Sequence, residues 1–346
     1  MDGEMERFIK VWISAIISLT YSYYIASRIP KGVFRLLSLL PVLYLFLILP
    51  LYLSSPTLVG TTSFFLWLAT FKLLLFSFNQ GPLALSPQNI IHFISIASFP
   101  VTPKQHPPTY QNHTTNKPRW LLPLKVLLFA MIIGSYGYKE NMHPKFLSLI
   151  YCCHVYLSLE LVLIFIGAMI RTFFGFEIEP QFNEPYLSSS LQDFWGHRWN
   201  LMVTHALRAT VYKPICRTFT SFVNSSCAAL AAMLVTFVAS GLIHELLYYY
   251  LIRVPPTWEV TWFFVLHGVC TVVEVVVKKV ASLRGWRLHG LVSRPLLISF
   301  LAITANWLFF PQLLRNGLDT KFAEEYALLF DIFKSKLSFT CDVIQF

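Results

Sequence analysis

The sequence places two adjacent ionisable side chains, His244 and Glu245, deep within an apolar stretch that runs from Cys227 to Ile252. An ionisable group in the hydrocarbon of a membrane is costly, so it usually faces a bundle interior or a polar cavity. Burial keeps an imidazole neutral, and a neutral imidazole can accept a proton from a reacting hydroxyl group. The alternative is a structural histidine with both nitrogens satisfied, and the membrane setting favours the functional interpretation.

Residues 177–217 form a second group of candidates, because this segment is too polar to span a membrane and too aromatic for a plain linker. Its interleaved aromatic and polar side chains could hold a polar headgroup against the membrane. An interfacial anchor without a binding role is the other interpretation, and the pattern alone does not separate the two. The polar and aromatic residues concerned are Asn183, Glu184, Tyr186, Gln192, Asp193, Trp195, His197, Arg198, Trp199 and Asn200.

Other ionisable residues within apolar stretches are weaker candidates. Glu160 lies in the fifth predicted span, and His154 has no partner visible in the sequence. His267 and Glu274 are seven residues apart, which places them on one face of a helix. Glu274 also lies four residues before Lys278, so we expect it to form an ion pair there.

Metal and nucleophile chemistry fit the sequence poorly. The histidines show none of the HxxxH or HxxHH spacing that membrane di-iron enzymes need. No HExxH, GxSxG or P-loop motif occurs, and the cysteines form no CxxC pair. We therefore expect neither a metal nor an organic cofactor. Acyl transfer from a cytosolic donor to a membrane-dissolved acceptor fits the features that remain. These are one buried base, an aromatic and polar cytosolic segment, and a membrane body that can dissolve a lipid.

The elements that must position these residues are membrane helices. The chain is 55% hydrophobic and only 13% charged, whereas a soluble domain carries about 25% charged residues. A spanning helix needs about 20 apolar residues. We therefore predict an all-α, polytopic transmembrane bundle in a single membrane-embedded domain, residues 1–346. The candidate spans are 8–27, 34–53, 57–79, 120–137, 146–170, 227–252, 258–277 and 292–311.

Charges between the spans predict the direction of insertion. Basic residues gather in alternate loops, and the positive-inside rule places these loops in the cytosol and the N-terminus in the lumen. Residues 101–118 are expected to be a flexible cytosolic loop, and residues 177–217 a cytosolic or interfacial segment. The net charge of +10 is explained by this topology and by anionic lipid headgroups, so nucleic acid is not an expected partner.

Two shorter helices are predicted at the membrane surface. From Ser190 onward, apolar residues such as Leu191, Phe194 and Met202 recur at helical spacing. We therefore predict an amphipathic interfacial helix near 190–203. Residues 88–100 are too few to span and are expected to be an interfacial helix or a re-entrant piece.

Four stretches carry a resemblance to a known family. Residues 183–200, which include Asn-Glu-Pro-Tyr and Ser-Leu-Gln-Asp-Phe-Trp-Gly-His-Arg-Trp-Asn, look like the signature of the plant wax ester synthases. These enzymes belong to the membrane-bound O-acyltransferase superfamily. Residues 8–18, 239–245 and 258–270 are also similar to that family, so the resemblance covers nearly the whole chain.

The resemblance implies roles for particular residues. His244 matches the catalytic histidine of the superfamily, and Asn200 matches its asparagine in a tryptophan-rich context, although the spacing between the two is longer than in sterol and diacylglycerol acyltransferases. Glu245, where some acetyl-transferring relatives carry aspartate, favours the alcohol-using branch. The expected substrate-binding residues are Tyr186, Gln192, Asp193, Trp195, Arg198, Trp199, Glu245 and His267.

The resemblance also implies the reaction. We expect direct acyl transfer from fatty acyl-CoA to a long-chain fatty alcohol or another lipid hydroxyl, in the endoplasmic reticulum membrane. Nε2 of His244 would accept the hydroxyl proton, and Asn200 would hold the thioester carbonyl or the acceptor hydroxyl. Basic residues could attract the CoA phosphates or could serve topology alone. The residues concerned are Arg198, Arg208, Lys213 and Arg217.

Two alternatives stay open. The first is a sterol or diacylglycerol O-acyltransferase, including one that transfers acetyl groups. The second belongs to another class, a non-catalytic lipid transporter or membrane scaffold.

Overall fold

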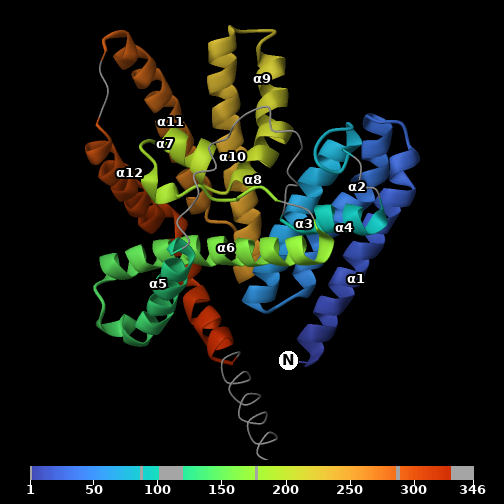
Figure 1. The fold of residues 1–346 in the computed structure, drawn as a ribbon, viewed down its shortest axis with the longest axis horizontal. Helices are drawn as coiled ribbons and strands as arrows, with labels where there is room; N and C mark the ends of the chain where they lie inside the picture. Colours follow the sequence, from blue (N-terminus) through green and yellow to red (C-terminus); the bar gives the residue numbers. More distant parts are fainter. Residues whose placement is uncertain (1, 86–88, 101–119, 176–177, 286–288, 329–346) are drawn as a thin grey trace, which may run out of the picture.

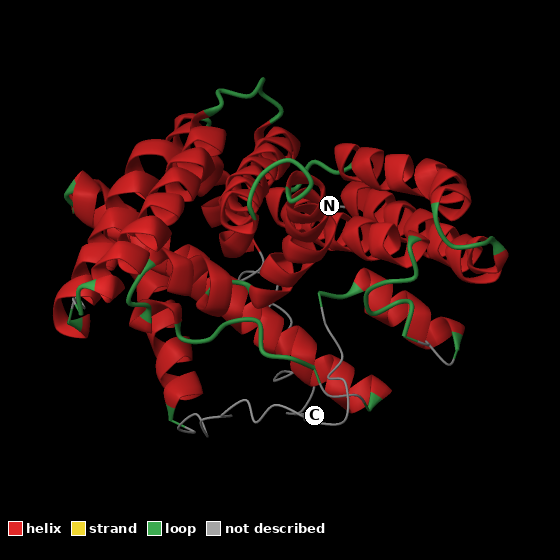
Figure 2. Cartoon of the chain, turned by 90° about the horizontal axis from the view of Figure 1, so that it is seen from above, coloured by secondary structure: helices red, strands yellow, loops and turns green. Residues whose placement is uncertain are grey.

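The computed structural model describes residues 2–85, 89–100, 120–175, 178–285 and 289–328, and within these ranges every regular element is a helix (Figures 1 and 2). The long helices are α1 (Asp2–Tyr24), α2 (Val33–Ile48), α3 (Pro56–Ser77), α5 (Leu121–Ser135), α6 (Pro144–Phe174), α10 (Ser225–Ile252), α11 (Glu259–Leu283) and α12 (Gly290–Thr304). The short helices are α4 (Ile90–Ser98), α7 (Leu191–Asp193), α8 (Leu201–Leu207), α9 (Lys213–Phe219) and α13 (Pro311–Arg315), and residues 318–328 are also helical.

Eight helical stretches in the described ranges are long and apolar enough to cross a membrane. They coincide with the eight predicted spans, so the all-α polytopic bundle is confirmed. Helix α4 has nine residues, too few to span, and it packs against α1 and α3. The predicted loop 101–118 lies outside the described residues.

Local chemistry sets where the long helices begin and end. Asn224 precedes α10, and its side-chain oxygen accepts a hydrogen bond from the Cys227 N–H at 2.9 Å. Arg253 ends α10 in a left-handed conformation, and its guanidinium donates to the carbonyl oxygen of Pro50 at 3.0 Å. Helix α6 ends at Gly175, which has φ of 70°. These caps satisfy backbone groups that would otherwise lack partners at the helix ends.

The helices form two groups with a helix running across them (Figure 1). Helices α1–α4 share an apolar core that includes Leu19, Leu39, Phe46 and Leu73. Among the described elements, helices α10 and α11 make the most extensive contact. Helix α6 runs across these helices, and the segment between α6 and α10 lies in the middle of the molecule, between the two groups.

Two glycines allow α10 and α11 to approach closely. A Cβ atom at Gly241 would lie 3.0 Å from the Cα of Thr261, and one at Gly268 would lie 2.8 Å from the Cβ of Phe237. Both distances are below ordinary van der Waals contact. The small residue that the sequence places three positions before His244 therefore serves close helix approach.

Buried cations close two helix C-termini in the α1–α4 group. The ammonium of Lys72 donates to the carbonyl oxygens of Ile96 and Phe99, each at 2.6 Å, at the end of α4. The guanidinium of Arg35 donates to the Phe76 carbonyl oxygen at 3.1 Å, at the end of α3. Positive charge is favourable at a helix C-terminus, where carbonyl groups lack partners. These cations therefore have structural partners.

The predicted amphipathic helix near 190–203 is interrupted. Helix α7 continues into a π-helical turn at Phe194–Arg198, and the chain leaves the helix at Trp199 and Asn200 before α8 begins. Asn200 has φ of 37°, which a right-handed helix does not permit. The apolar periodicity continues through this break, and therefore the sequence pattern did not reveal it.

Candidate active site

A cavity of about 720 Å³ lies between the α1–α4 group, α6 and α10–α12. Most of its wall is apolar, with aromatic side chains from α2, α3, α6, α10 and α11 and from the turns between the long helices. Three π-helical turns border it, Phe194–Arg198, Arg208–Tyr212 and Ala305–Phe309. Turns of this kind occur often at functional sites, because they redirect side chains within a helix. The cavity contains both residues for which the sequence predicts a catalytic role.

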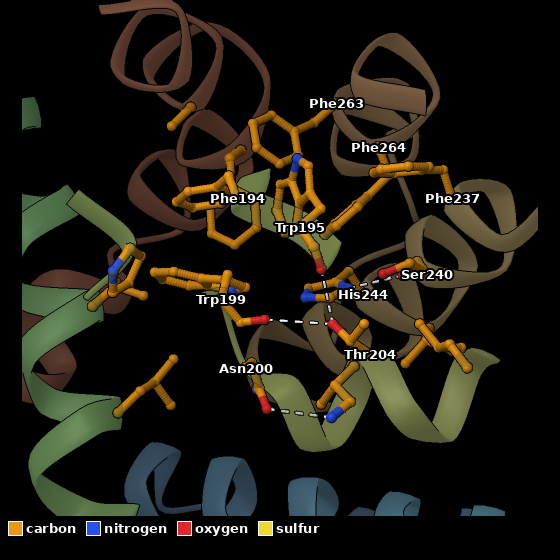
Figure 3. A pocket seen from close by; sticks show the side chains of 18 of the residues that line it. Phe194, Trp195, Trp199, Asn200, Thr204, Phe237, Ser240, His244, Phe263 and Phe264 are labelled. Atoms are coloured by element: carbon orange, nitrogen blue, oxygen red, sulfur yellow. Dashed lines mark hydrogen bonds between the residues drawn. The ribbon is translucent and has the colours of Figure 1, made fainter. Parts of the chain in front are cut away.

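His244 faces this cavity from the middle of α10 (Figure 3). Its Nδ1 lies 2.8 Å from the carbonyl oxygen of Ser240, one turn earlier in the helix. A carbonyl oxygen only accepts hydrogen bonds, so Nδ1 carries the proton and Nε2 keeps its lone pair in the neutral imidazole. The ring of Phe264 packs beside the imidazole at a centroid distance of 4.4 Å. The unprotonated nitrogen therefore points into the cavity, where a general base would be needed.

Asn200 approaches the same space from the opposite side (Figure 3). It is 8% exposed, and its Oδ1 accepts a hydrogen bond from the Val203 N–H at 3.4 Å, which caps α8. This bond identifies the oxygen of the amide, so the Nδ2 group is the free end. Nδ2 makes no hydrogen bond within the described ranges, and it is available to donate to a ligand.

Thr204 holds the backbone between the two tryptophans. Its Oγ1 lies 3.0 Å from the carbonyl oxygen of Trp195 and 3.4 Å from that of Trp199, and it donates to these carbonyls (Figure 3). The π-helical turn and the break after it leave these carbonyls without helical partners. Thr204 therefore fixes the irregular backbone that carries Asn200.

Trp195 forms one wall of the cavity and is held from behind by His267. The indole Nε1 donates to Nδ1 of His267 at 3.1 Å, and Nε2 of His267 lies 2.9 Å from Oγ1 of Thr304. Because Nδ1 accepts, Nε2 carries the proton and donates to Thr304. His267 is fully buried and does not line the cavity, so the structure places it behind a substrate wall rather than against a substrate.

Trp199 and Tyr186 form the wall opposite His244. Trp199 stacks on Phe194 at a centroid distance of 5.3 Å, and it packs against Tyr156 of α6 at 6.1 Å. The Tyr186 hydroxyl donates to the carboxylate of Glu184. Burial and this carboxylate raise the pKa of Tyr186 above the usual value of a tyrosine. Its hydroxyl therefore remains protonated and continues to donate at neutral pH.

The structure brings most of the predicted site residues together at the cavity, but not all of them. Asp193 and Arg198 form an ion pair with each other at 2.8 Å, and neither lines the cavity. The carboxylate of Glu245 accepts hydrogen bonds from Thr261 of α11 at 3.2 Å and lies outside the cavity wall. The predicted residues that do line it are Tyr186, Gln192, Trp195, Trp199, Asn200 and His244.

The basic residues considered for the CoA phosphates divide in a similar way. Arg208 lines the cavity, whereas Arg198 is held by Asp193. Lys213 and Arg217 are exposed on α9. Of these four residues, Arg208 is the one that lines the cavity.

Some site features were not found from the sequence. Glu274 forms the expected ion pair with Lys278 at 2.9 Å, and it also accepts a hydrogen bond from the Leu191 N–H at 2.8 Å. This second contact fixes the start of α7, and no sequence signal indicates it. Thr204 and Ser240 each lie four residues from a predicted catalytic residue, and helical spacing could have suggested both. Within the described ranges, His, Cys, Asp and Glu side chains form no group that could hold a metal ion.

The chain is similar to known proteins across almost its full length. The model of the membrane bound O-acyl transferase family matches residues 178–266, which include Asn200 and His244. "Probable long-chain-alcohol O-fatty-acyltransferase 3" from Arabidopsis thaliana is 47% identical over 338 residues, 97% of this chain and 98% of that protein. "Long-chain-alcohol O-fatty-acyltransferase" from Simmondsia chinensis is 44% identical over 347 residues, 97% of this chain and 98% of that protein.

Proposed function

The chain belongs to the long-chain-alcohol O-fatty-acyltransferases of the membrane-bound O-acyltransferase family, and we propose that it forms wax esters with His244 as the general base. The donor is fatty acyl-CoA and the acceptor is a long-chain fatty alcohol. The endoplasmic reticulum is the proposed membrane, on the resemblance to plant wax ester synthases.

The observation that carries the proposal is the hydrogen bond between Nδ1 of His244 and the carbonyl oxygen of Ser240. It commits the proton to Nδ1 and leaves Nε2 free in an apolar cavity. Nε2 accepts the proton of the alcohol as its oxygen attacks the thioester carbonyl carbon. When the tetrahedral intermediate collapses, the C–S bond breaks and the imidazolium returns the proton to the departing CoA thiolate. The histidine is regenerated, and no acyl-enzyme is needed.

Asn200 supports the proposal from across the cavity. Its free Nδ2 group is a hydrogen-bond donor, and negative charge develops on the thioester oxygen during attack. A donor fixed in advance stabilises that charge without reorganisation, and one such donor is worth roughly 10²–10³-fold in rate. The N-cap bond to Val203 engages Oδ1 and so leaves Nδ2 for this role.

The apolar wall suits both substrates and opposes hydrolysis. Two long hydrocarbon chains are soluble in a cavity lined by Trp195, Trp199, Phe263 and Phe264. Water in the same cavity would compete with the alcohol for the thioester, and an apolar wall reduces its access. Arg208, at the cavity wall, is positioned to attract the phosphates of a donor that enters from the cytosol.

The test is expression in yeast that lacks its own neutral-lipid acyltransferases, with a long-chain alcohol, a sterol and diacylglycerol available together. The wild-type chain should produce wax esters, measured by mass spectrometry of total lipids. His244→Ala should lower wax ester synthesis roughly 10²–10⁴-fold at equal protein abundance. Steryl esters or triacylglycerols without wax esters would show that the acceptor is a sterol or diacylglycerol and not a long-chain alcohol.

A matched control comes from a second membrane histidine. His154 lies in α6, is partly buried like His244, bonds Tyr136 through one ring nitrogen and does not line the cavity. His154→Ala should retain wax ester synthesis. Full wax ester synthesis by His244→Ala would contradict the catalytic role of this residue.

A further inference from the structure

The backbone on both sides of Asn200 is hydrogen-bonded to one neighbouring segment. The Asn183 N–H donates to the carbonyl oxygen of Arg198 at 3.0 Å, and the Leu201 N–H donates to that of Gln181 at 2.8 Å. The guanidinium of Arg198 also donates to the Asn183 carbonyl oxygen at 3.1 Å. Residues 181–184 and 198–201 thus lie side by side, joined by hydrogen bonds. The position of Asn200 in the second segment therefore depends on the position of the first.

The residue that follows this pairing, Glu184, enters a buried cluster of charges. Nζ of Lys125 in α5 lies 2.8 Å from Oε1 of Glu160 in α6 and 3.1 Å from Oε2 of Glu184. Lys125, Glu160 and Glu184 are 5%, 3% and 8% exposed. The Tyr186 hydroxyl donates to the same Glu184 carboxylate. One ammonium therefore joins two membrane helices to the loop that carries Asn200.

The backbone is strained at one residue in each of the two paired segments. Glu184 has φ of 45° and Asn200 has φ of 37°, both in the left-handed region. Asparagine visits this region more readily than most residues, whereas glutamate seldom does. Such conformations persist where surrounding contacts over-determine them, and they cluster at functional sites. Contacts that hold Glu184 include the buried ion pair with Lys125 and the hydrogen bond from the Tyr186 hydroxyl. Arg198 also donates to its carbonyl oxygen, at 3.4 Å.

We propose that Lys125, Glu160 and Glu184 are positioning residues that fix the Asn200 amide in the catalytic cavity. None of the three lines the cavity, so they act through the loop and not on a substrate. A buried ion pair adds little net stability compared with apolar packing, so stability alone is a weak reason to place three charges here. The inference rests on the role of Asn200 in the proposed function.

The first experiment compares Lys125→Met and Glu184→Gln with the wild type as purified, monodisperse protein in detergent. A misplacement of about 1 Å can cost 10²-fold, so kcat for wax ester synthesis should fall roughly 10- to 100-fold. The KM for acyl-CoA should stay within about twofold, because the lost interaction is made in the transition state. Lys125→Arg, which keeps the charge, should recover most of the rate. Wild-type kcat in both neutral variants would overturn the proposal.

Lys72→Met is the matched control. Like Lys125, Lys72 is 5% exposed and lies in a membrane helix. Its substitution also leaves buried oxygen atoms without a donor, but these oxygens lie at the end of α4 and not in the loop that carries Asn200. The control should unfold at a lower temperature and keep kcat within about twofold per folded molecule. An equal loss of kcat in Lys72→Met would show a general effect of removing a buried lysine, which would contradict the positioning role.

A double-mutant cycle separates this inference from the proposed function. If Lys125 acts through Asn200, the variant Asn200→Gly with Lys125→Met should be no slower than Asn200→Gly alone. If the double variant instead shows the product of the two single-variant losses in kcat, the inference is wrong. Wild-type kcat in Asn200→Gly alone would instead refute the proposed role of Asn200. If Lys125→Met does not accumulate as folded protein, Glu184→Gln, which keeps the side-chain shape, carries the same cycle.

Discussion

At the scale of single residues, the site depends on side chains whose hydrogen bonds leave one atom uncommitted. His244 uses Nδ1 on its own helix, and Asn200 uses Oδ1 on the helix that follows it. In each case the bond identifies which atom remains for the substrate. The two free atoms, Nε2 and Nδ2, are the base and the hydrogen-bond donor in the proposed acyl transfer.

Substitution of Asn200 by glycine should separate its two roles. Glycine accepts the left-handed backbone, and at an N-cap it costs only a few tenths of a kcal/mol relative to asparagine. The amide donor is lost, so kcat should fall roughly 10²–10³-fold while the unfolding temperature changes little. Kinetics and thermal unfolding of the same preparation measure both quantities. A large loss of stability with normal kcat would assign Asn200 to folding alone.

His267 should behave as a structural residue with an indirect effect on the site. His267→Leu removes the acceptor of the Trp195 indole N–H and leaves that group unpaired, whereas the Thr304 hydroxyl keeps its bond to the Phe300 carbonyl oxygen. The expected cost is about 1–3 kcal/mol for the unpaired N–H, seen as a lower unfolding temperature. His154→Leu removes the hydrogen-bond partner of Tyr136 at a half-buried position and should cost less. The prediction fails if the two variants unfold at the same temperature.

The sequence indicated some of these residues and missed others for physical reasons. An imidazole in an apolar stretch is visible without any structure, because hydropathy alone shows its cost. Lys125, Glu160 and Glu184 are 35 and 24 residues apart in sequence, and only the folded arrangement shows that they meet. Glu245 and His267 were expected to bind substrate, but they bond to neighbouring helices and do not line the cavity.

At the scale of elements, the packing of α10 on α11 determines where His244 lies. Gly241 and Gly268 remove side chains from this contact, and Phe237, which lines the cavity, packs directly against Gly268. On α10, Gly241 lies within one turn of His244, and Phe237 lies about two turns before it. A change in the spacing of these helices should therefore move the imidazole of His244.

Gly268→Ala tests this coupling. The added methyl group would lie 2.8 Å from the Cβ of Phe237, so α10 must move or Phe237 must leave its position. Overpacking of this kind costs about 1–3 kcal/mol. We expect a lower unfolding temperature and a reduced rate of wax ester synthesis. Gly134→Ala in α5, where no atom lies within 4 Å of the added carbon, is the matched control and should be neutral or slightly stabilising. Equal behaviour of the two variants would contradict the packing argument.

At the scale of the whole molecule, hydropathy predicted the architecture well. Bilayer thickness imposes a length on every spanning helix, so composition located all eight spans within a few residues at most boundaries. The arrangement of those spans depends on contacts between distant segments, such as the hydrogen bond between Thr57 and Glu325. No periodicity in the sequence encodes such a pair, so the position of the cavity could not be predicted.

The direction of insertion is a prediction for the whole chain. Positive-inside asymmetry places the N-terminus in the lumen and the loop after α11 in the cytosol. A glycosylation sequon on an extension ahead of Met1 should be modified in microsomes, whereas one inserted in the loop between α11 and α12 should remain unmodified. Glycosidase-sensitive mobility shifts report the result. The opposite pattern would reverse the topology and would put the donor on the wrong side of the membrane.

The three π-helical turns around the cavity also affect how the gene can vary. Each such turn holds one residue more than an α-helix of the same path, and therefore acts as a fixed insertion. Deleting one codon there would restore a regular α-helix along the same path and would remove the local redirection of side chains. A deletion within Arg208–Tyr212 would therefore change how these two residues face the cavity. Related enzymes should therefore keep the codon number of these turns even where their residues differ.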